Sequence, residues 1–293
     1  MRYHQKLFML AGLSALISCG SGSDSDEPAR FSLAVTDAPI DQATQVVVQF
    51  TAIELKPRNG SSVVINLASP QSIDLLALQN GETATLLDQH TIAAGEYDWV
   101  RLAVNAEFDN VYDSYIVFDN LQHELFVPSG AQTGLKLNQG FTVAEGQTAR
   151  FVIDFDLRKS IVEPVGQPGY FLKPTLRLID LQQVGALSGE IAEARIINLC
   201  QGEELGAVYV YSGVDVTPDD VDGRDPEPLT SVLVYRDDVR YRYHVGFLAP
   251  GNYTAAYTCD AVNDLPESDQ PLVFTTAANV SITANATTTL NFD

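Results

Sequence analysis

The sequence predicts an all-β protein that contains two β-sandwich domains. Short runs that alternate polar and apolar residues recur along the 293 residues, separated by Gly, Pro, Asn and Asp. No apolar period of 3.6 residues is sustained, which argues against a helical bundle and against a doubly wound α/β fold. We therefore expect β-sandwiches, which follow a signal peptide and a flexible tether.

The first residues are typical of a secretory signal. Arg2 and Lys6 precede an apolar run over residues 7–17, and a small residue then stands before Cys19. The run is too short for a membrane-spanning helix, which needs roughly 20 apolar residues. Residues 16–19 resemble the bacterial lipobox, whose cysteine is lipidated and becomes the new first residue. An ordinary signal peptide or a short buried helix is the alternative.

This lipobox-like segment also predicts where the protein resides. We expect residues 1–18 to be a lipoprotein signal peptide and residues 19–30 to be a lipidated, polar tether that cannot form a core. Gly20 and Ser21 follow the cysteine where an aspartate would indicate the inner membrane. The resemblance therefore implies an outer-membrane lipoprotein of the bacterial cell envelope, on its periplasmic or surface face, with the lipid as its link to the membrane.

The charge of the chain narrows the classes of partner. The sequence has 17 basic and 38 acidic side chains and a formal net charge of −21. Nucleic acid is bound through Lys and Arg, so a nucleic-acid partner is not expected. Adsorption to anionic lipid headgroups is disfavoured for the same reason.

The cysteines predict one disulfide. If Cys19 is lipidated, Cys200 and Cys259 remain. In an oxidising compartment such a pair is most simply a disulfide bond. Two separate buried thiols are the alternative.

The expected strands follow one another through both domains. In the first domain, residues 31–184, they cover 31–36, 45–55, 62–67, 97–104, 115–118 and 150–157, with a short helical turn at 73–78. In the second domain, residues 185–293, they cover 191–197, 207–211, 231–235, 240–245, 253–259 and 280–283. In each domain a Gly turn stands two residues before a Tyr that opens a strand, at Tyr97 and at Tyr253. This shared feature indicates two sandwiches of related architecture.

Several ordered motifs carry a family resemblance. They include Val35-Thr36-Asp37-Ala38-Pro39, Ala94-Gly95-Glu96-Tyr97, Gly134-Leu135-Lys136-Leu137, Asp154-Phe155-Asp156 and Leu172-Lys173-Pro174. Residues 31–181 thereby resemble the bacterial lipoprotein family of domain of unknown function 4382. The run from Leu248 to Tyr253 makes the second domain similar to transthyretin-like and carboxypeptidase-regulatory-like sandwiches. This resemblance implies β-sandwiches of the prealbumin or immunoglobulin-like kind. The family of domain of unknown function 4382 carries no established activity, so the resemblance to it implies architecture and location only.

Catalytic motifs do not stand out in this sequence. His90, His123 and His244 lie far apart and show no metal-ligand spacing. Neither a nucleophile elbow nor a Gly-rich phosphate loop is present. We therefore expect a protein that is not an enzyme, with a hydrolase that uses a carboxylate pair as the remote alternative.

Asp154 and Asp156 form a candidate site for calcium or a basic ligand. They share one face of an expected strand, about 7 Å apart at ~3.3 Å per residue. Neighbouring carboxylates repel each other unless a cation or hydrogen bonds offset them. The alternative is a solvated strand face that pairs with Arg158, Lys159 or Lys173.

An acidic loop is the second candidate site. It contains Asp219, Asp220, Asp222 and Asp225 around a glycine. Oxygen ligands in a flexible loop suit Ca²⁺, and the protein is expected to have either no cofactor or calcium. The alternative is a solvated acidic loop on an acidic protein.

The third candidate site is aromatic. On the expected strand 97–104, Tyr97, Trp99 and Arg101 share the face opposite Val100 and Leu102. A sugar ring or a peptide could stack on Trp99 there. The alternative is that a loop or the neighbouring sandwich covers the indole.

These observations favour a lipid-anchored cell-envelope protein that is a non-catalytic binding or structural module. Its expected partner beyond the membrane is an envelope protein or a glycan. The competing hypothesis is a carbohydrate- or calcium-binding adhesion module.

Overall fold

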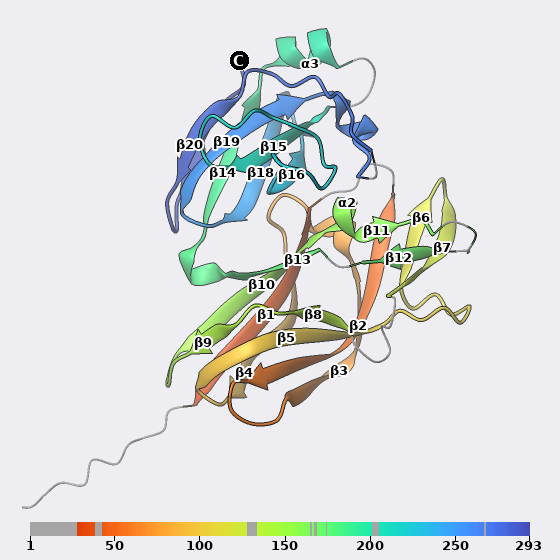
Figure 1. Cartoon of the computed structure of the whole chain (residues 1–293), viewed down its shortest axis with the longest axis vertical. Coiled ribbons are helices and arrows are strands. Elements are labelled where there is room, and N and C mark those ends of the chain that lie inside the picture. Colours follow the sequence, from red (N-terminus) through yellow and green to blue (C-terminus); the bar gives the residue numbers. More distant parts are fainter. Residues whose placement is uncertain are drawn as a thin grey trace, which may run out of the picture.

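The structure is a computed structural model that describes residues 28–38, 43–127, 134–164, 166, 169–173, 175–200, 205–266 and 268–293. Cys19 and the expected signal peptide lie outside these residues. The predicted all-β class is confirmed, because the described strands form four sheets that pack as two pairs (Figure 1). Across the described residues, no helix is both long and apolar enough to cross a membrane.

The first pair of sheets is built from the chain before residue 181. One sheet contains, in spatial order, β13 (Leu176–Asp180), β10 (Thr148–Asp156), β1 (Ala29–Ala38) and β4 (Ala84–Ile92). The other contains β11 (Ile161–Val162), β12 (Tyr170–Leu172), β7 (Leu121–Phe126), β6 (Tyr115–Phe118), β2 (Gln45–Pro57), β5 (Gly95–Asn105) and β8 (Leu135–Leu137). β3 (Val63–Asp74) pairs with β2, and β9 (Phe141–Val143) pairs with β5. The core lies between the two sheets.

Alternation of side chains explains this core. Phe31, Leu33 and Val35 point inward from β1, and Phe151, Ile153 and Phe155 do so from β10, which are spacings of two residues. Side chains from both sheets, including Phe50 of β2, interdigitate there. The prediction that Asp154 lies on the face of β10 opposite Ile153 and Phe155 is therefore confirmed.

The second pair of sheets is built from the chain after residue 184. One sheet contains, in spatial order, β17 (Tyr235–Asp237), β18 (Arg240–Leu248), β14 (Gly185–Ile191) and β21 (Thr287–Thr289). The other contains β16 (Thr230–Leu233), β15 (Ala207–Ser212), β19 (Gly251–Thr258) and β20 (Ala278–Ile282). β15 is buried on both faces, because Val208 lies in the core between the sheets while Tyr209 packs beneath a layer of loops. The division of the chain into domains at residues 184 and 185 stays a prediction.

Short helices interrupt the strands. They are η1 (Leu75–Leu78), α2 (Leu157–Ser160), η2 (Leu181–Gln183), α3 (Glu193–Leu199) and η3 (Asp260–Asn263). The predicted strand at 191–197 is wrong beyond Ile191, because α3 occupies that stretch. Its Glu, Ala, Arg and Leu residues favour a helix, and Ile196 is buried whereas its neighbour Ile197 is 69% exposed. Ile196 therefore lies on the buried side of the helix and Ile197 on its exposed side.

The Gly-x-Tyr feature has the same structure in both pairs of sheets. β5 begins at Gly95 and β19 at Gly251, each two residues before its tyrosine. The hydroxyl of Tyr97 donates a 2.8 Å hydrogen bond to the carbonyl of Ala93, four residues earlier. Tyr253 makes the same 2.8 Å bond to the carbonyl four residues before it. The tyrosine thus ties each strand to the turn that precedes it.

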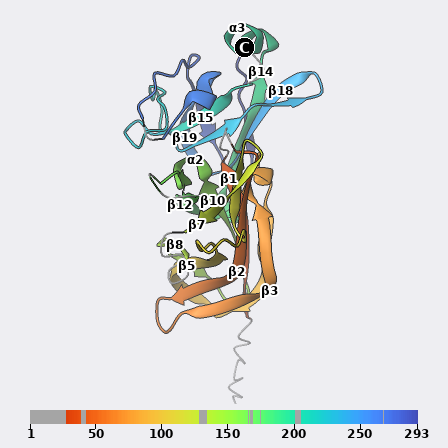
Figure 2. The ribbon, with the colours of Figure 1, turned by 90° about the vertical axis from the view of Figure 1, so that its right-hand side faces the viewer.

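The two pairs of sheets lie end to end (Figures 1 and 2). β1 begins at the end of the molecule far from the second pair and runs toward it, with β10 parallel beside it. The carboxyl ends of β1 and β10 therefore meet the second pair. We call this region the junction. It comprises the residues around the ends of β1 and β10 and those that face them from the second pair of sheets, which include Asp37, Asp154, Arg158, Lys159 and Arg177 on one side and Tyr209, Glu227, Thr230, His244 and Asp264 on the other.

Candidate functional site

Two of the motifs that carry the family resemblance come together at the junction. β1 and β10 pair in parallel, with Thr36 opposite Asp154 and Ala38 opposite Asp156. The Thr36-Asp37-Ala38 segment and the Asp154-Phe155-Asp156 segment therefore lie side by side. Asp37 is 7% exposed and belongs to β1. These segments are more than a hundred residues apart in the sequence, so their contact could not be predicted from sequence position alone.

Asp154 is a buried carboxylate that is paired with an arginine. It is 7% exposed, and Arg177 on the adjacent β13 donates from Nε to Oδ2 at 3.0 Å. Burial raises the pKa of Asp154, and the Arg177 guanidinium lowers that pKa in part. The predicted solvation of this face is wrong for Asp154, because residues of the second pair of sheets, such as Thr230 and Val232, enclose this side of β10. The predicted pairing with Lys159 holds for Asp156, whose Oδ2 lies 3.6 Å from the lysine Nζ.

Asp156 has a different set of contacts from Asp154. Its Oδ1 accepts a 3.3 Å hydrogen bond from the backbone N–H of Lys159 and so caps α2. Lys159 then extends across the junction, where its Nζ forms an ion pair with Glu227 and a 3.0 Å hydrogen bond with the carbonyl of Pro228. The two aspartates therefore act separately, and Asp156 positions a lysine that links the two pairs of sheets.

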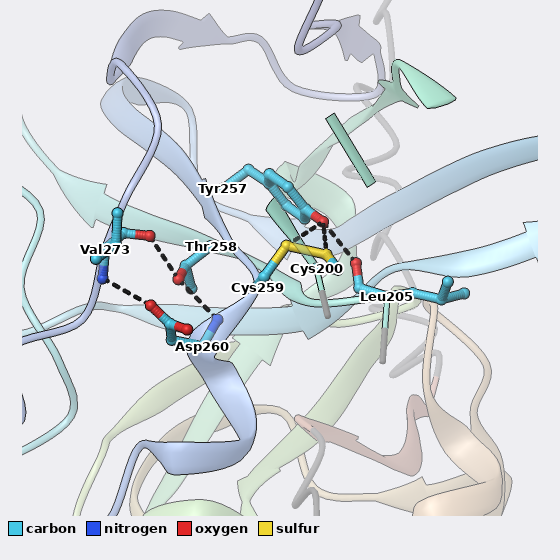
Figure 3. Close-up of a disulfide and its surroundings, with 7 residues drawn as sticks. All are labelled: Cys200, Leu205, Tyr257, Thr258, Cys259, Asp260 and Val273. Carbon is cyan, nitrogen blue, oxygen red and sulfur yellow. Dashed lines mark hydrogen bonds between the residues drawn. A yellow bond between two sulfur atoms is a disulfide. The ribbon is translucent and has the colours of Figure 1, made fainter. Parts of the chain in front are cut away.

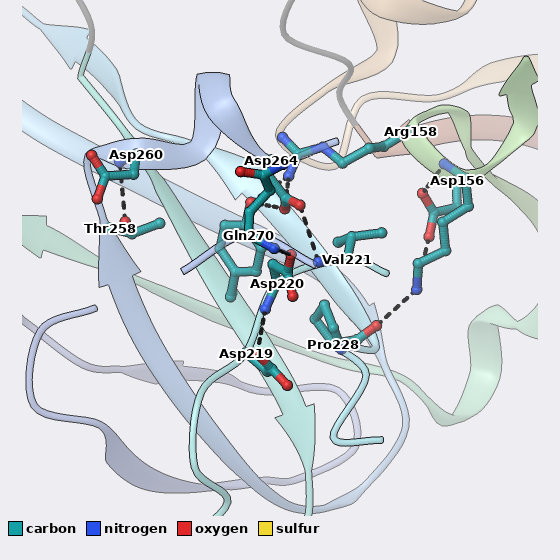
Figure 4. Close-up of polar contacts among 12 residues, drawn as sticks. Asp156, Arg158, Asp219, Asp220, Val221, Pro228, Thr258, Asp260, Asp264 and Gln270 are labelled. Atoms are coloured by element: carbon teal, nitrogen blue, oxygen red, sulfur yellow. Dashed lines mark hydrogen bonds and ion pairs between the residues drawn. The ribbon is translucent and has the colours of Figure 1, made fainter. Parts of the chain in front are cut away.

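Arg158 is the main polar link across the junction (Figure 4). It extends from α2 into the second pair of sheets, where its Nη1 lies 2.9 Å from Oδ2 of Asp264. Both side chains are almost inaccessible, at 4% and 0% exposure. The hydroxyl of Tyr209 accepts a hydrogen bond from Arg158 and donates one to Asp264, and Val221 N–H donates to Asp264 Oδ1 at 3.1 Å. This cluster satisfies a buried charge pair from several directions.

A small cavity lies next to Asp154. It has a volume of about 20 Å³, and its lining includes Asp37, Asp154 and Arg177 from the first pair of sheets and His244 from the second. This volume suits one water molecule. His244 packs against Gly81, where an added Cβ would lie 3.1 Å from the imidazole. The glycine therefore allows the two surfaces to approach closely.

Acidification is expected to weaken the junction through His244. Burial lowers the pKa of His244 from its ordinary value of 6.5, so the folded state favours neutral imidazole. The unfolded chain binds that proton more readily. This contribution to stability is therefore complete above pH 6.5 and is lost as the pH falls through 6.5 toward the lower folded-state pKa.

Urea unfolding of the wild type at about pH 7.5 and about pH 5.5 measures this loss. In the variant His244→Gln, which has no imidazole to protonate, the difference between the two pH values should shrink. An equal difference in both proteins would assign the pH dependence to other groups.

The predicted acidic calcium loop uses part of its carboxylates for contacts within the protein. Asp220 is 1% exposed, and its Oδ2 accepts a hydrogen bond from the backbone N–H of Gln270. Asp222 forms a 2.9 Å ion pair with Arg224. Asp219 lies beside Asp220 and accepts its N–H at 3.1 Å, whereas Asp225 is exposed. Within the described residues, no group of three or more His, Cys, Asp or Glu side chains is arranged to hold a metal.

Trp99 lies among cations on the outer face of β5. The Nζ of Lys136 is 4.6 Å from the centre of a Trp99 ring, and the guanidinium carbon of Arg101 is 4.9 Å away. Arg101 also forms a 3.0 Å ion pair with Glu54. The indole is partly buried and already contacts two cations, an arrangement that stabilises the sheet surface.

The predicted position of Tyr97 on the Trp99 face is wrong. Tyr97 is 3% exposed and stacks on Phe141 in the core, with ring centres 4.9 Å apart. The pairing of β2 with β5 shifts register between Lys56 and Pro57, so β5 holds one extra residue at this point. That bulge reverses the alternation of side chains along β5, which a sequence pattern does not reveal.

The predicted disulfide between Cys200 and Cys259 is confirmed (Figure 3). Cys200 directly follows α3, and Cys259 directly follows β19. The hydroxyl of Tyr257 lies 3.0 Å from the sulfur of Cys200 and 3.2 Å from that of Cys259, and it donates to the carbonyl of Leu205. The bond therefore links the C-terminal end of α3 to the C-terminal end of β19.

Several residues of the junction were not predicted as site residues, among them Arg177, Tyr209, His244 and Asp264. Arg177 stands in the short apolar run Leu-Arg-Leu-Ile, and an arginine within a strand could have indicated a partner for a buried acid. Tyr209 lies in an apolar run that reads as core. Nothing in the local sequence distinguishes Asp264 from the other aspartates of this acidic chain.

These features define an all-β protein whose two pairs of sheets are joined through a buried ion pair. Residues 28–174, about half of the chain, match the family described as "Domain of unknown function (DUF4382)". The chain belongs to that family, and the predicted resemblance is confirmed. Comparison with curated proteins finds no match.

Three solved structures of bacterial proteins match this chain at low sequence identity. GBS52, the minor pilin of Streptococcus agalactiae, is 12% identical with a TM-score of 0.21, over 89% of this chain and 94% of that one. BcpA, the major pilin subunit of Bacillus cereus, is 10% identical with a TM-score of 0.22, over 90% and 98%. The TIE protein of Bacillus anthracis is 10% identical with a TM-score of 0.19, over 90% of this chain and 33% of that protein. Similarities at this level carry no functional argument.

Proposed function

We propose that this protein is a non-catalytic structural or binding module of the bacterial cell envelope, held at the outer membrane by a lipid on Cys19. In this function the two pairs of sheets act as one rigid body. The observation that carries the proposal is the buried cluster of Arg158, Tyr209 and Asp264. A connection of this kind fixes the arrangement of the two pairs of sheets, which a structural or binding module requires.

Further contacts across the junction support a rigid connection. Lys159 of the first pair of sheets forms an ion pair with Glu227 of the second, with side chains only 20% and 22% exposed. His244 of the second pair packs against Gly81 of the first. These contacts surround the ion pair of Arg158, so that a hinge motion would have to break all of them together.

The carboxylates of the junction support a non-catalytic function. A hydrolase of the paired-carboxylate kind needs two acids that flank a space for its substrate. Asp37 and Asp154 border a cavity of about 20 Å³, which is far too small for a sugar ring. Burial also raises the pKa of Asp220, but Asp220 does not line this cavity. The acids with raised pKa values therefore do not share a substrate site here.

The adhesion alternative receives less support from the geometry. Of the four predicted calcium ligands, Asp220 and Asp222 already accept hydrogen bonds from Gln270 and Arg224. The indole of Trp99 already contacts two cations. Calcium binding and glycan binding therefore stay predictions, and the structural function is the one that we favour.

The membrane anchor depends on Cys19. Replacing Cys19 with Ser is expected to move the protein from the membrane fraction to the soluble fraction of the cell, because a serine has no thiol to lipidate. Fractionation followed by immunoblotting measures the change, and mass spectrometry of the N-terminal peptide detects the lipid. Ser23→Ala, in the same tether, is the matched control and should stay with the membrane. Continued sedimentation of Cys19→Ser with membranes would contradict the anchor.

A further inference from the structure

The edge strand β13 borders a cleft between the two pairs of sheets. β13 is the outermost strand of its sheet, with β10 on its inner side. A cleft of about 560 Å³ lies along it, lined by Leu178 and Asp180 on one side and by Leu229, Phe247 and Pro250 on the other. Clefts of this volume between domains are typical of ligand sites. This cleft adjoins the small cavity beside Asp37, because Arg177 and Phe247 line both.

The backbone of β13 presents hydrogen-bonding groups to the open side. The N–H of Leu178 donates to the side-chain oxygen of Gln139 at 3.4 Å, and the amide nitrogen of Gln139 donates to the Leu178 carbonyl at 2.8 Å. The backbone of Leu178 therefore points away from β10. The backbone N–H and C=O groups of successive residues point to alternate sides of a strand. The groups of Leu176 and Asp180 therefore point away from β10, as those of Leu178 do. Within the described residues, no strand pairs with this edge.

Phe247 lies on the opposite wall of the cleft in an unusual conformation. The pairing of β14 with β18 changes register between Gly185 and Leu187, which places an extra residue on β18 at this point. Phe247 has a φ of 56°, a left-handed conformation that is rare for a bulky side chain. Bulges redirect side chains, and strained residues concentrate at functional sites. Here the bulge leaves the partly exposed ring of Phe247 among the residues that line the cleft.

We propose that this cleft binds an extended peptide segment of a partner protein, which adds to the sheet as a strand beside β13. The backbone of Leu176, Leu178 and Asp180 would pair with the segment, as in other cases of strand addition. An apolar side chain of the segment would pack against Phe247 and Leu229. This goes beyond the proposed function, and it does not depend on the lipid anchor.

Charge indicates the chemistry of the segment. Of the two charged residues that line the cleft, Arg177 is already paired with Asp154, whereas Asp180 has no cationic partner among the described residues. The whole chain has a net charge of −21. We therefore infer a segment that carries Lys or Arg next to its apolar residue, because an acidic segment would be repelled.

Gln139 occupies the position that the incoming strand would take. Its side-chain amide satisfies both backbone groups of Leu178, as a neighbouring strand would do. An exposed edge strand is a risk for aggregation, and a side chain that covers it reduces that risk. The peptide must displace Gln139, so removing this side chain should strengthen binding. A residue that only supported the fold would have the opposite effect or none.

The experiment is selection of a phage-displayed library of random dodecapeptides on the purified full-length protein, followed by affinity measurement on synthetic copies of the enriched peptides. We expect enriched peptides that alternate apolar and polar residues and carry Lys or Arg. Fluorescence anisotropy should show binding that is about fivefold tighter to Gln139→Ala, the equivalent of one net hydrogen bond. Binding should be about tenfold weaker to Phe247→Gly, which keeps the left-handed backbone but removes the ring. Bound peptide should slow hydrogen exchange over residues 176–180.

Matched controls separate these effects from changes in folding. Gln122→Ala removes an exposed glutamine from β7, outside the cleft, and should bind like the wild type. Leu229→Ala provides a second test of the apolar wall if Phe247→Gly lowers the melting temperature. The proposal is overturned if no peptide is enriched on the wild type or on Gln139→Ala. It is equally overturned if the enriched peptides bind Gln139→Ala no more tightly, bind both apolar-wall variants with wild-type affinity, or leave exchange over residues 176–180 unchanged.

Discussion

Replacing Arg158 with Met is expected to lower the free energy of unfolding by about 3–5 kcal/mol, because it leaves Asp264 as an uncompensated charge in the interior. Asp264 would keep its hydrogen bonds from Tyr209 and Val221 but lose its cation. Calorimetry should show one cooperative transition for the wild type. For Arg158→Met we expect two transitions, since the two pairs of sheets would then unfold separately.

The matched control for this prediction is Arg240→Met. Arg240 forms a 2.8 Å ion pair with Glu190, but both side chains are exposed, at 57% and 42%. An exposed pair of this kind contributes about 0–1 kcal/mol. If Arg158→Met were no more destabilising than Arg240→Met, the buried cluster would not be what joins the two pairs of sheets. The double variant Arg158→Met with Asp264→Leu should regain part of the loss, because no unpaired charge remains.

Removing the disulfide with the double variant Cys200→Ser and Cys259→Ser is expected to lower the free energy of unfolding by about 4 kcal/mol. The bond closes a loop between cysteines 59 positions apart, and opening it restores conformational entropy to the unfolded chain. Because the wild type is expected to unfold in one cooperative transition, the loss should lower the midpoint of that transition. Urea unfolding followed by the change in fluorescence or circular dichroism measures it.

Reduction of the wild-type protein provides the control for this prediction. Under reducing conditions the wild type should resemble the double variant, whereas the double variant itself should not respond to the reductant. Stability of the wild type that is unchanged by complete reduction would show that the bond adds little to the fold. Reaction of the unreduced, denatured protein with a thiol reagent tests independently whether Cys200 and Cys259 are bonded in the cell.

Much of the fold could be predicted because most strands carry their own pattern. The run over Tyr115–Phe118 is strand at the predicted residues, and β2 and β15 lie where alternating or continuous apolar runs indicated them. Short strands such as β8 and β12 were missed, because three residues are too few to show a period. The longer strands β4 and β7 were missed as well, because polar residues interrupt their apolar ones. α3 was misassigned, because its two adjacent isoleucines resemble a strand more than a helix.

The candidate site was predictable only in part, because its partners come from distant parts of the chain. Asp154 was identified as an acid in need of a partner, but that partner, Arg177, depends on which strand pairs with β10. Arg158 and Asp264 are 106 residues apart and meet only when the two pairs of sheets pack together. The disulfide, in contrast, was predictable because composition left Cys200 and Cys259 as the pair in the expected mature protein. Local patterns define strands, whereas the junction depends on tertiary structure.

The direction of β1 has a mechanical consequence. β1 enters the fold at Ala29, far from the second pair of sheets, and lies between β10 and β4 for most of its length (Figure 1). A pull applied at the N-terminal end and resisted at the far end of the molecule would slide β1 lengthwise past both neighbours. Under such shear many backbone hydrogen bonds bear the load at the same time, whereas peeling would break them one after another. A protein tethered at this end would thus hold its distal sheets in place against drag.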